Sequence, residues 1–193
     1  MTGSSERPLE VHYGTEGSSG CRMSLLIPLQ SVCLAAFALL LLAAAWQDLR
    51  TMRIADGLSL AIVAIFGVWA ACGFAFGGIS FVRIAMALGG TAAVFALGAF
   101  AFAVGVLGGG DVKLLAASSL FAGPDLLLEF LSVTALAGGI LGLAVLAGVP
   151  IGPTAAADST SMRTRLRGGL PYGPAIAAGG LWVAAALAMS WSR

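Results

Sequence analysis

Charged residues are scarce in this chain of 193 residues. Asp, Glu, Lys and Arg make up 10% of the sequence, whereas 59% of it is hydrophobic. A soluble domain carries roughly one quarter charged residues, so the composition excludes that class. Lipid offers no partners for open backbone groups, which favours helices that satisfy their own hydrogen bonds. The sequence therefore predicts an all-α fold, a polytopic membrane helix bundle held in a lipid bilayer.

Histidine and closely spaced cysteines are also missing from most of the chain. The single histidine is His12, near the start, and Cys21, Cys33 and Cys72 lie far apart without a C-x-x-C motif. These absences argue against a zinc peptidase, a zinc ribbon and a Ser-His-Asp triad in the membrane domain. We expect no metal and no cofactor. The net charge is +1 and no basic patch carries interleaved aromatics, so we expect no nucleic acid partner.

The first 22 residues differ in composition from the rest. They are polar, rich in Ser and Gly, and carry three glutamates. Such a segment cannot bury enough apolar surface to order itself. We therefore predict a disordered polar tail over residues 1–22 and one membrane domain over residues 23–193, and we expect deletion of the tail to leave activity intact.

Apolar runs divide the membrane domain into about six candidate transmembrane spans. A helix needs about 20 apolar residues to cross a hydrocarbon core roughly 30 Å thick. The fourth run has about a dozen residues and reaches only ~18 Å, so it is either a short crossing or a re-entrant segment. The runs are Leu25–Trp46, Gly57–Phe76, Ile84–Leu107, Val112–Ala122, Leu126–Val149 and Gly173–Trp191.

The distribution of basic residues predicts the orientation, because cytoplasmic loops are enriched in Lys and Arg. If the fourth run crosses, one side of the membrane receives the connections with Arg50, Arg53, Lys113, Arg163, Arg165 and Arg167. The other side receives Arg83 and Arg193, with Arg7 and Arg22 in the tail. We therefore expect the first side to be cytoplasmic and both termini to lie outside.

Two acids fall at span boundaries on the predicted cytoplasmic side. Asp48 ends the first run and Asp111 begins the fourth. A charged carboxylate near the membrane boundary is costly to bury, so an acid at this position is a candidate functional residue. Two carboxyls can share a proton, so that one acts as a base toward water while the other donates to a carbonyl. The alternatives are an ion pair of Asp48 with Arg50 or Arg53, and a helix-capping role for Asp111.

Neighbouring residues have simpler interpretations. Asp56 and Asp125 precede apolar runs and are expected to be helix N-caps. Glu129 and Asp125 are predicted to lie on the far side of the membrane. Lys113 is interpreted as a positive-inside anchor. The glycines at 108–110 allow another backbone to approach Asp111 closely.

Three sequence elements together resemble the prepilin peptidases. Gly108-Gly109-Gly110-Asp111-Val112-Lys113 matches the G-x-G-D-x-K motif of membrane aspartic peptidases. The segment 48–54 is similar to the family's D-x-x-x-x-x-I-P-N element, and the segment 170–175 to its P-x-G-P element. The resemblance implies that Asp48 and Asp111 are the catalytic pair. It assigns supporting positions to Gly108, Gly110, Lys113, Pro171 and Gly173.

The resemblance also implies a substrate and a location. Prepilin peptidases remove the leader from type IV pilin-like precursors at the cytoplasmic face of the bacterial inner membrane, and the short form is similar to peptidases of tight-adherence pilus systems. The chain departs from the family pattern at Ala55 and Asp56, which replace Pro and Asn, so Asp56 is a rival acid near Asp48. It lacks a Cys-rich segment, which argues against the N-methyltransferase activity of longer members.

Three other functions stay open on the sequence. A presenilin-type peptidase shares G-x-G-D but pairs it with Tyr-Asp, whereas Gln47 precedes Asp48 here. A small multi-span transporter would carry an acid in mid-span. An inactive relative could act as a pilus-assembly factor.

Overall fold

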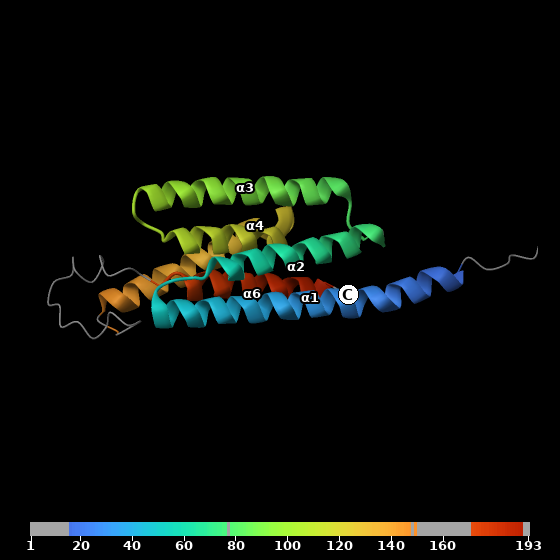
Figure 1. The fold of residues 1–193 in the computed structure, drawn as a ribbon, viewed down its shortest axis with the longest axis horizontal. Helices are drawn as coiled ribbons and strands as arrows, with labels where there is room; N and C mark the ends of the chain where they lie inside the picture. The colour runs from blue at the N-terminus through green and yellow to red at the C-terminus, as the bar shows by residue number, and fades with distance from the viewer. Residues whose placement is uncertain (1–15, 77, 148, 150–170, 191–193) are drawn as a thin grey trace, which may run out of the picture.

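The computed structural model describes residues 16–76, 78–147, 149 and 171–190. Over these residues the chain is built from helices, without strands. They are α1 (Glu16–Thr51), α2 (Asp56–Ala75), α3 (Phe81–Ala103), α4 (Gly109–Leu146) and α6 (Gly173–Ser190). Figure 1 shows them lying roughly along one common axis.

The described helices are long and apolar enough to cross a membrane. Five meet that criterion, with mean hydropathies from 1.5 for α6 to 2.2 for α2. Because the hydrocarbon core has no water to satisfy polar backbone groups, such helices are the stable form of these sequences. The predicted all-α membrane bundle is confirmed, and the expectation of about six spans is close to the five observed helices.

The difference in number arises in α4, which combines the fourth and fifth predicted runs. Gly123 interrupts its helical geometry with a φ of 55° and a ψ of −166°. A side chain rarely adopts that positive φ, and the following Pro124 has no N–H to donate. Figure 1 shows α4 reversing its direction beyond this point.

Contacts along α4 agree with this reversal. Its first segment, 109–122, runs antiparallel to α3: Val112 lies against Gly98, and Ser119 donates a hydrogen bond to Thr91. Asp125 then forms an ion pair with Arg83 in the first turn of α3. The chain has therefore reached the far end of the bundle at Gly123.

The second segment of α4, 124–146, returns along α6. Glu129 accepts a hydrogen bond from Trp182 in the middle of α6, and Gly138 lies against Tyr172 at its start. The two segments of α4 thus occupy the two predicted runs, and the first one extends between the two ends of the bundle.

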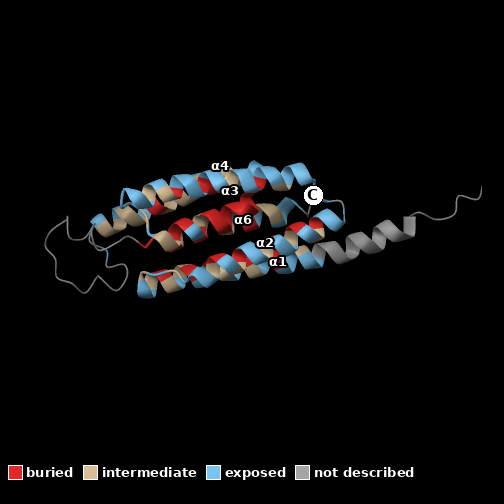
Figure 2. Ribbon diagram, turned by 45° about the horizontal axis from the view of Figure 1, so that its top comes forward, coloured by how far each residue is buried: buried red, intermediate tan, exposed pale blue. Residues whose placement is uncertain are grey.

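A cluster of aromatic rings forms the centre of the packed core. Phe121 stacks on Phe37 with 4.2 Å between ring centroids and meets Phe66 edge-on at 5.4 Å. Trp69 tilts against the same ring. This cluster joins α1, α2 and α4. Figure 2 shows that α6 carries a large share of the buried positions in the middle of the bundle.

The outer surface of the bundle is apolar, as lipid contact requires. α3 packs mainly on α4 and presents its other faces outward. Phe81, Leu97 and Phe100 on α3 are each about two thirds or more exposed. Trp46 is also exposed near the end of α1, a position that suits an aromatic side chain at a membrane interface.

Two predictions concern segments that the structure describes only in part. α1 begins at Glu16, so residues 16–22 are helical where a disordered tail was predicted. Once the apolar run has formed a helix, adding residues at its N-terminal end costs little free energy, because each gains a helical hydrogen bond. Residues 1–15 and the three arginines 163, 165 and 167 lie outside the described residues. The division of the chain at residue 22 stays a prediction.

Candidate active site

Asp48 lies in the last turn of α1 and is buried. Only 4% of its surface is exposed. One carboxylate oxygen, Oδ2, accepts a hydrogen bond of 2.7 Å from the backbone N–H of Gly173 at the start of α6. A hydrogen bond to an ionised acceptor is stronger than a neutral one and partly offsets the cost of burial. The end of α1 is thereby tied to the start of α6.

Asp111 lies in the first turn of α4 and is 9% exposed. Its Oδ2 accepts a hydrogen bond of 3.1 Å from the backbone N–H of Gly108, the N-cap residue. Asp111 is therefore the third helical residue, and its carboxylate caps the helix end from inside. The predicted helix-capping role of Asp111 therefore describes this contact correctly. The cap uses only Oδ2, so the carboxyl can also take part in catalysis through its other oxygen.

The structure brings the two aspartates to the same end of the bundle. Ile54, in the connection that follows Asp48, packs on Gly110, the residue before Asp111. Among the described residues, the hydrogen bonds that hold the pair use Oδ2 of each side chain and leave both Oδ1 atoms available. Two buried acids therefore share one site, each fixed by a single backbone donor.

The alternative ion pair of Asp48 does not form in the described part of the chain. The guanidinium of Arg50 lies over the ring of Trp46, 4.4 Å from its centroid. The two ion pairs seen among described residues involve Asp125 and Asp56. The charge of Asp48 is thus not neutralised by Arg50 or Arg53.

Glycines allow the three sequence elements to meet. A Cβ on Gly173 would lie 2.7 Å from Cβ of Asp48 and 2.8 Å from its Oδ2. A Cβ on Gly110 would lie 3.2 Å from Cβ of Ile54 and 3.3 Å from its carbonyl oxygen. Such distances leave no ordinary space for a side chain. Gly108 is similarly close to Asp111.

An ion pair beside the site was not predicted. The ammonium of Lys113 lies 2.8 Å from Oδ1 of Asp56, and both side chains are more than half exposed. Asp56 was expected to be an N-cap, but Ala55 occupies that position and Asp56 is the first residue of α2. Its charge still favours the positive end of the helix. This ion pair could have been expected, because the sequence predicted Lys113 and Asp56 on the same face of the membrane.

The connection between α1 and α2 is held by its own polar contacts. Met52 adopts a φ of 53°, and its N–H donates to the carbonyl of Asp48. The hydroxyl of Thr51 donates to the carbonyls of Gln47 and Arg53. A left-handed residue is frequent just after a helix, but a non-glycine residue there is strained. This turn fixes Ile54 against Gly110, a feature that sequence reasoning missed.

The remaining acids lie away from the pair. Asp125 binds Arg83 and Glu129 binds Trp182, both towards the other end of the bundle. In the part of the chain that the structure describes, no three His, Cys, Asp or Glu side chains gather into a group suited to a metal ion.

Comparison with known proteins gives one match. The model of the type IV leader peptidase family matches residues 35–143, more than half of the chain. The matched region contains Asp48, Asp111 and Lys113, and it ends before Pro171 and Gly173. No curated protein and no solved structure matches. The resemblance inferred from the three sequence elements is thereby confirmed at the level of the family.

Proposed function

This multi-pass membrane chain belongs to the type IV leader peptidase family, and we propose that it is an aspartic endopeptidase with Asp48 and Asp111 as its catalytic pair. The proposed reaction removes the leader peptide from type IV pilin-like precursors. The proposed setting is the cytoplasmic face of the bacterial inner membrane.

The observation that carries the proposal is the pairing of two buried carboxyls from distant parts of the chain. Asp48 and Asp111 are buried at the same end of the bundle, and each is held by one backbone N–H. Burial of two acids at one end of a membrane bundle is costly. A catalytic pair explains the cost, because each carboxyl keeps an oxygen for a substrate or a water molecule.

The pair supports hydrolysis by shared acid and base catalysis. In the proposed reaction, the ionised carboxylate takes a proton from water while the protonated carboxyl donates its proton to the carbonyl oxygen of the scissile bond. The oxygen of the water bonds to the carbonyl carbon. Collapse of this diol intermediate breaks the C–N bond: one of its hydroxyls returns a proton to the carboxylate that donated one, and the leaving amine receives a proton from the carboxyl that took it from water. The pair then returns to its starting state.

Charge supports the proposed orientation. The end of the bundle with the aspartates carries Arg50, Arg53 and Lys113, because these residues lie at the end of α1, just after it and near the start of α4. Arg83 lies in the first turn of α3, at the other end. Cytoplasmic connections are enriched in basic residues. α4 ends and α6 begins on the side of the aspartates, and the sequence that joins them contains a further three arginines. These features favour an active site that faces the cytoplasm.

The transporter alternative receives no support from the described acids. A proton-coupled transporter would need a carboxyl in mid-span. The buried carboxylates among the described residues are Asp48 and Asp111, which share one end of the bundle. The peptidase assignment accounts for both residues at once.

Co-expression with a pilin precursor tests the proposal. The wild type, Asp48→Asn and Asp111→Asn are compared at matched membrane levels, and cleavage is followed as a mobility shift with the new N-terminus read by mass spectrometry. We expect cleavage by the wild type and by neither variant. Cleavage by both variants would refute the pair and redirect attention to Asp56. A wild type that leaves every precursor intact would support a transporter or an inactive assembly factor.

A further inference from the structure

A cavity lies at the end of the bundle opposite the aspartate pair. Its volume is about 400 Å³, and it is bordered by residues of all five described helices. α2 and α3 both pack on α4 but make little contact with each other. The cavity is lined by residues of α2, α3 and α4 among others, and its lining does not include Asp48 or Asp111. It is therefore separate from the candidate active site.

The lining is mainly aromatic and aliphatic. Phe66, Phe121 and Ile84 supply large apolar surfaces, and Ala87 and Leu187 complete the walls. Apolar side chains around an open space lose contacts that a ligand of the same character would restore. The interior of the cavity thus suits a hydrocarbon group.

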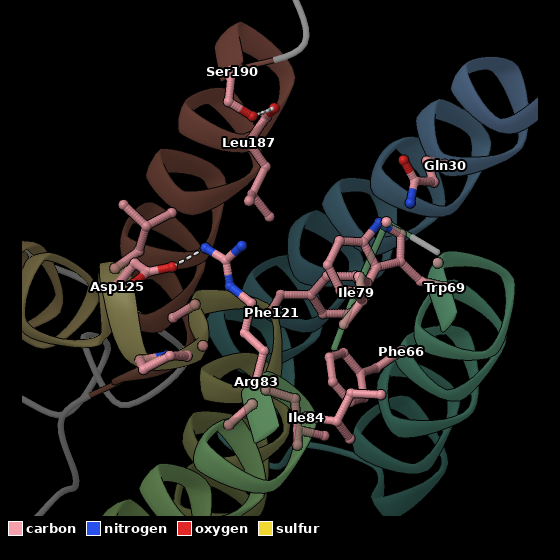
Figure 3. A pocket seen from close by; sticks show the side chains of 18 of the residues that line it. Gln30, Phe66, Trp69, Ile79, Arg83, Ile84, Phe121, Asp125, Leu187 and Ser190 are labelled. Atoms are coloured by element: carbon pink, nitrogen blue, oxygen red, sulfur yellow. Dashed lines mark hydrogen bonds and ion pairs between the residues drawn. The ribbon is translucent and has the colours of Figure 1, made fainter. Parts of the chain in front are cut away.

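Polar groups lie at the edges of the cavity. In Figure 3 the guanidinium of Arg83 lies on the left beside Asp125 and the amide of Gln30 lies at the upper right, whereas Phe66 and Ile84 lie lower in the view. The side chain of Arg83 is 57% exposed. The cavity therefore combines an apolar interior with an accessible polar margin.

The polar margin has unused hydrogen-bond donors. The indole N–H of Trp69 is buried and donates to no described group. Arg83 uses one nitrogen, Nη2, for Asp125, and a guanidinium offers five N–H donors in all. Unpaired donors of this kind call for a ligand rich in acceptor oxygens, and Arg is well suited to phosphate.

The cavity has a volume of about 400 Å³, which is small beside a whole transmembrane helix. A flexible acyl chain needs much less width and can follow an irregular wall.

We propose that this cavity binds one acyl chain of a membrane phospholipid, with the phosphate oxygens at Arg83 and an acceptor oxygen at the indole N–H of Trp69. The surroundings supply that ligand, because Phe74, Phe81 and Val82 beside the cavity are exposed apolar residues on the lipid-facing surface. The proposal does not depend on the peptidase assignment. It adds a structural lipid site at the far end of the bundle.

Quenching of Trp69 fluorescence by brominated lipid tests the proposal. The full chain is prepared with Trp46, Trp182 and Trp191 replaced by Phe, so that Trp69 is the sole indole. It is reconstituted in vesicles of phosphatidylglycerol brominated in mid-chain, and each variant is referenced to the same lipid without bromine. Bromine quenches at short range, so a chain inside the cavity is expected to quench Trp69.

A matched pair of substitutions distinguishes the cavity from the surrounding bilayer. Ala87 is buried and lines the cavity, whereas Ala85 on the same helix is exposed and does not. We expect Ala87→Leu to lose the quenching and Ala85→Leu to keep it. Ala122→Leu fills the cavity from α4 and serves if Ala87→Leu does not fold. Equal quenching in the filled and parent proteins, or none in the parent, overturns the proposal.

The head group is tested with the same parent protein. Phosphatidylglycerol and diacylglycerol with identical brominated chains are compared at equal mole fraction. We expect stronger quenching by phosphatidylglycerol than by diacylglycerol. This preference should be lost when Arg83→Gln is combined with Asp125→Asn, a double substitution that removes both members of the ion pair and leaves no unpaired charge. Equal quenching by the two lipids, or a preference that survives the double substitution, overturns the assignment of the phosphate to Arg83.

Discussion

The backbone N–H of Gly173 donates a hydrogen bond of 2.7 Å to Oδ2 of Asp48, across 125 positions of the sequence. This contact joins two of the three sequence elements. Ile54 and Gly110 join the first element to the remaining one through close packing. The elements that are separate in the sequence thus form one compact site, and the following predictions test its parts.

Substitution of Gly173 by Ala should displace the carboxyl of Asp48. The new Cβ would lie 2.7 Å from Cβ of Asp48, and neither backbone can easily move away. A displacement of about 1 Å can lower a rate by roughly 100-fold. We expect a loss of cleavage on that order, measured as initial rates with purified protein in detergent. Gly139→Ala is the control, because nothing lies within 4 Å of its Cβ, and a similar loss in both variants would contradict the account.

The ion pair of Lys113 and Asp56 should contribute little to stability. Both side chains are more than half exposed, and exposed pairs contribute about 0.2–1 kcal/mol. We expect a coupling energy in this range from a double-mutant cycle with Lys113→Met and Asp56→Asn, measured by unfolding in mixed micelles. Asp56→Asn should also retain cleavage, since its carboxylate is engaged with Lys113. An inactive Asp56→Asn would make Asp56 a member of the acid pair.

The strained turn at Met52 should respond to the size of its side chain. Its φ of 53° is unfavourable for a residue with a Cβ by about 1–2 kcal/mol. A β-branched side chain fits worse, so Met52→Ile should destabilise the protein and lower cleavage by shifting Ile54. Asn tolerates this conformation, and Met52→Asn should leave both properties near the wild type. Thermal inactivation rates provide the comparison, and a harmless Met52→Ile would show that the turn does not position the site.

The aromatic cluster should dominate the stability of the bundle. Phe121 is 2% exposed and packs on Phe37 and Phe66. Truncation of a buried Phe to Ala costs about 3–5 kcal/mol. We expect Phe121→Ala to lower the unfolding free energy in mixed micelles by about this amount. Phe100→Ala on the lipid-facing surface of α3 should change it little, because that side chain is 69% exposed. Equal effects would show that the cluster is not a packed core.

Much of the fold could be predicted because apolar composition and helix length are local properties. The second predicted run ends one residue after the end of α2, and the last predicted run begins at the first residue of α6. The number of helices was less certain because Gly123 and Pro124 turn the chain without an intervening loop. The helical start of α1 was missed because polar residues beside a span join its helix at little cost.

The candidate site was only partly accessible to sequence reasoning. Asp48 and Asp111 follow from span counting and motif spacing, and the packing of Ile54 on Gly110 brings their segments to one end of the bundle. The donor for each carboxylate could not be predicted, because the N–H groups of Gly173 and Gly108 depend on helix packing. The same holds for the pairing of Asp56 with Lys113. Opposite charges on one predicted face indicated that they could meet, but not that they do.

The most direct test of the two-aspartate peptidase compares purified wild type, Asp48→Asn, Asp111→Asn and the double variant under single-turnover conditions with one pilin precursor. Residues that act as one unit are strongly non-additive, so each single substitution should reduce the cleavage rate to the level of the double variant. Glu129→Gln, an exposed residue beside Trp182 in the middle of α6, should cleave like the wild type. A single variant that keeps the wild-type rate, or rate losses in the two singles that multiply in the double, would contradict a shared catalytic site.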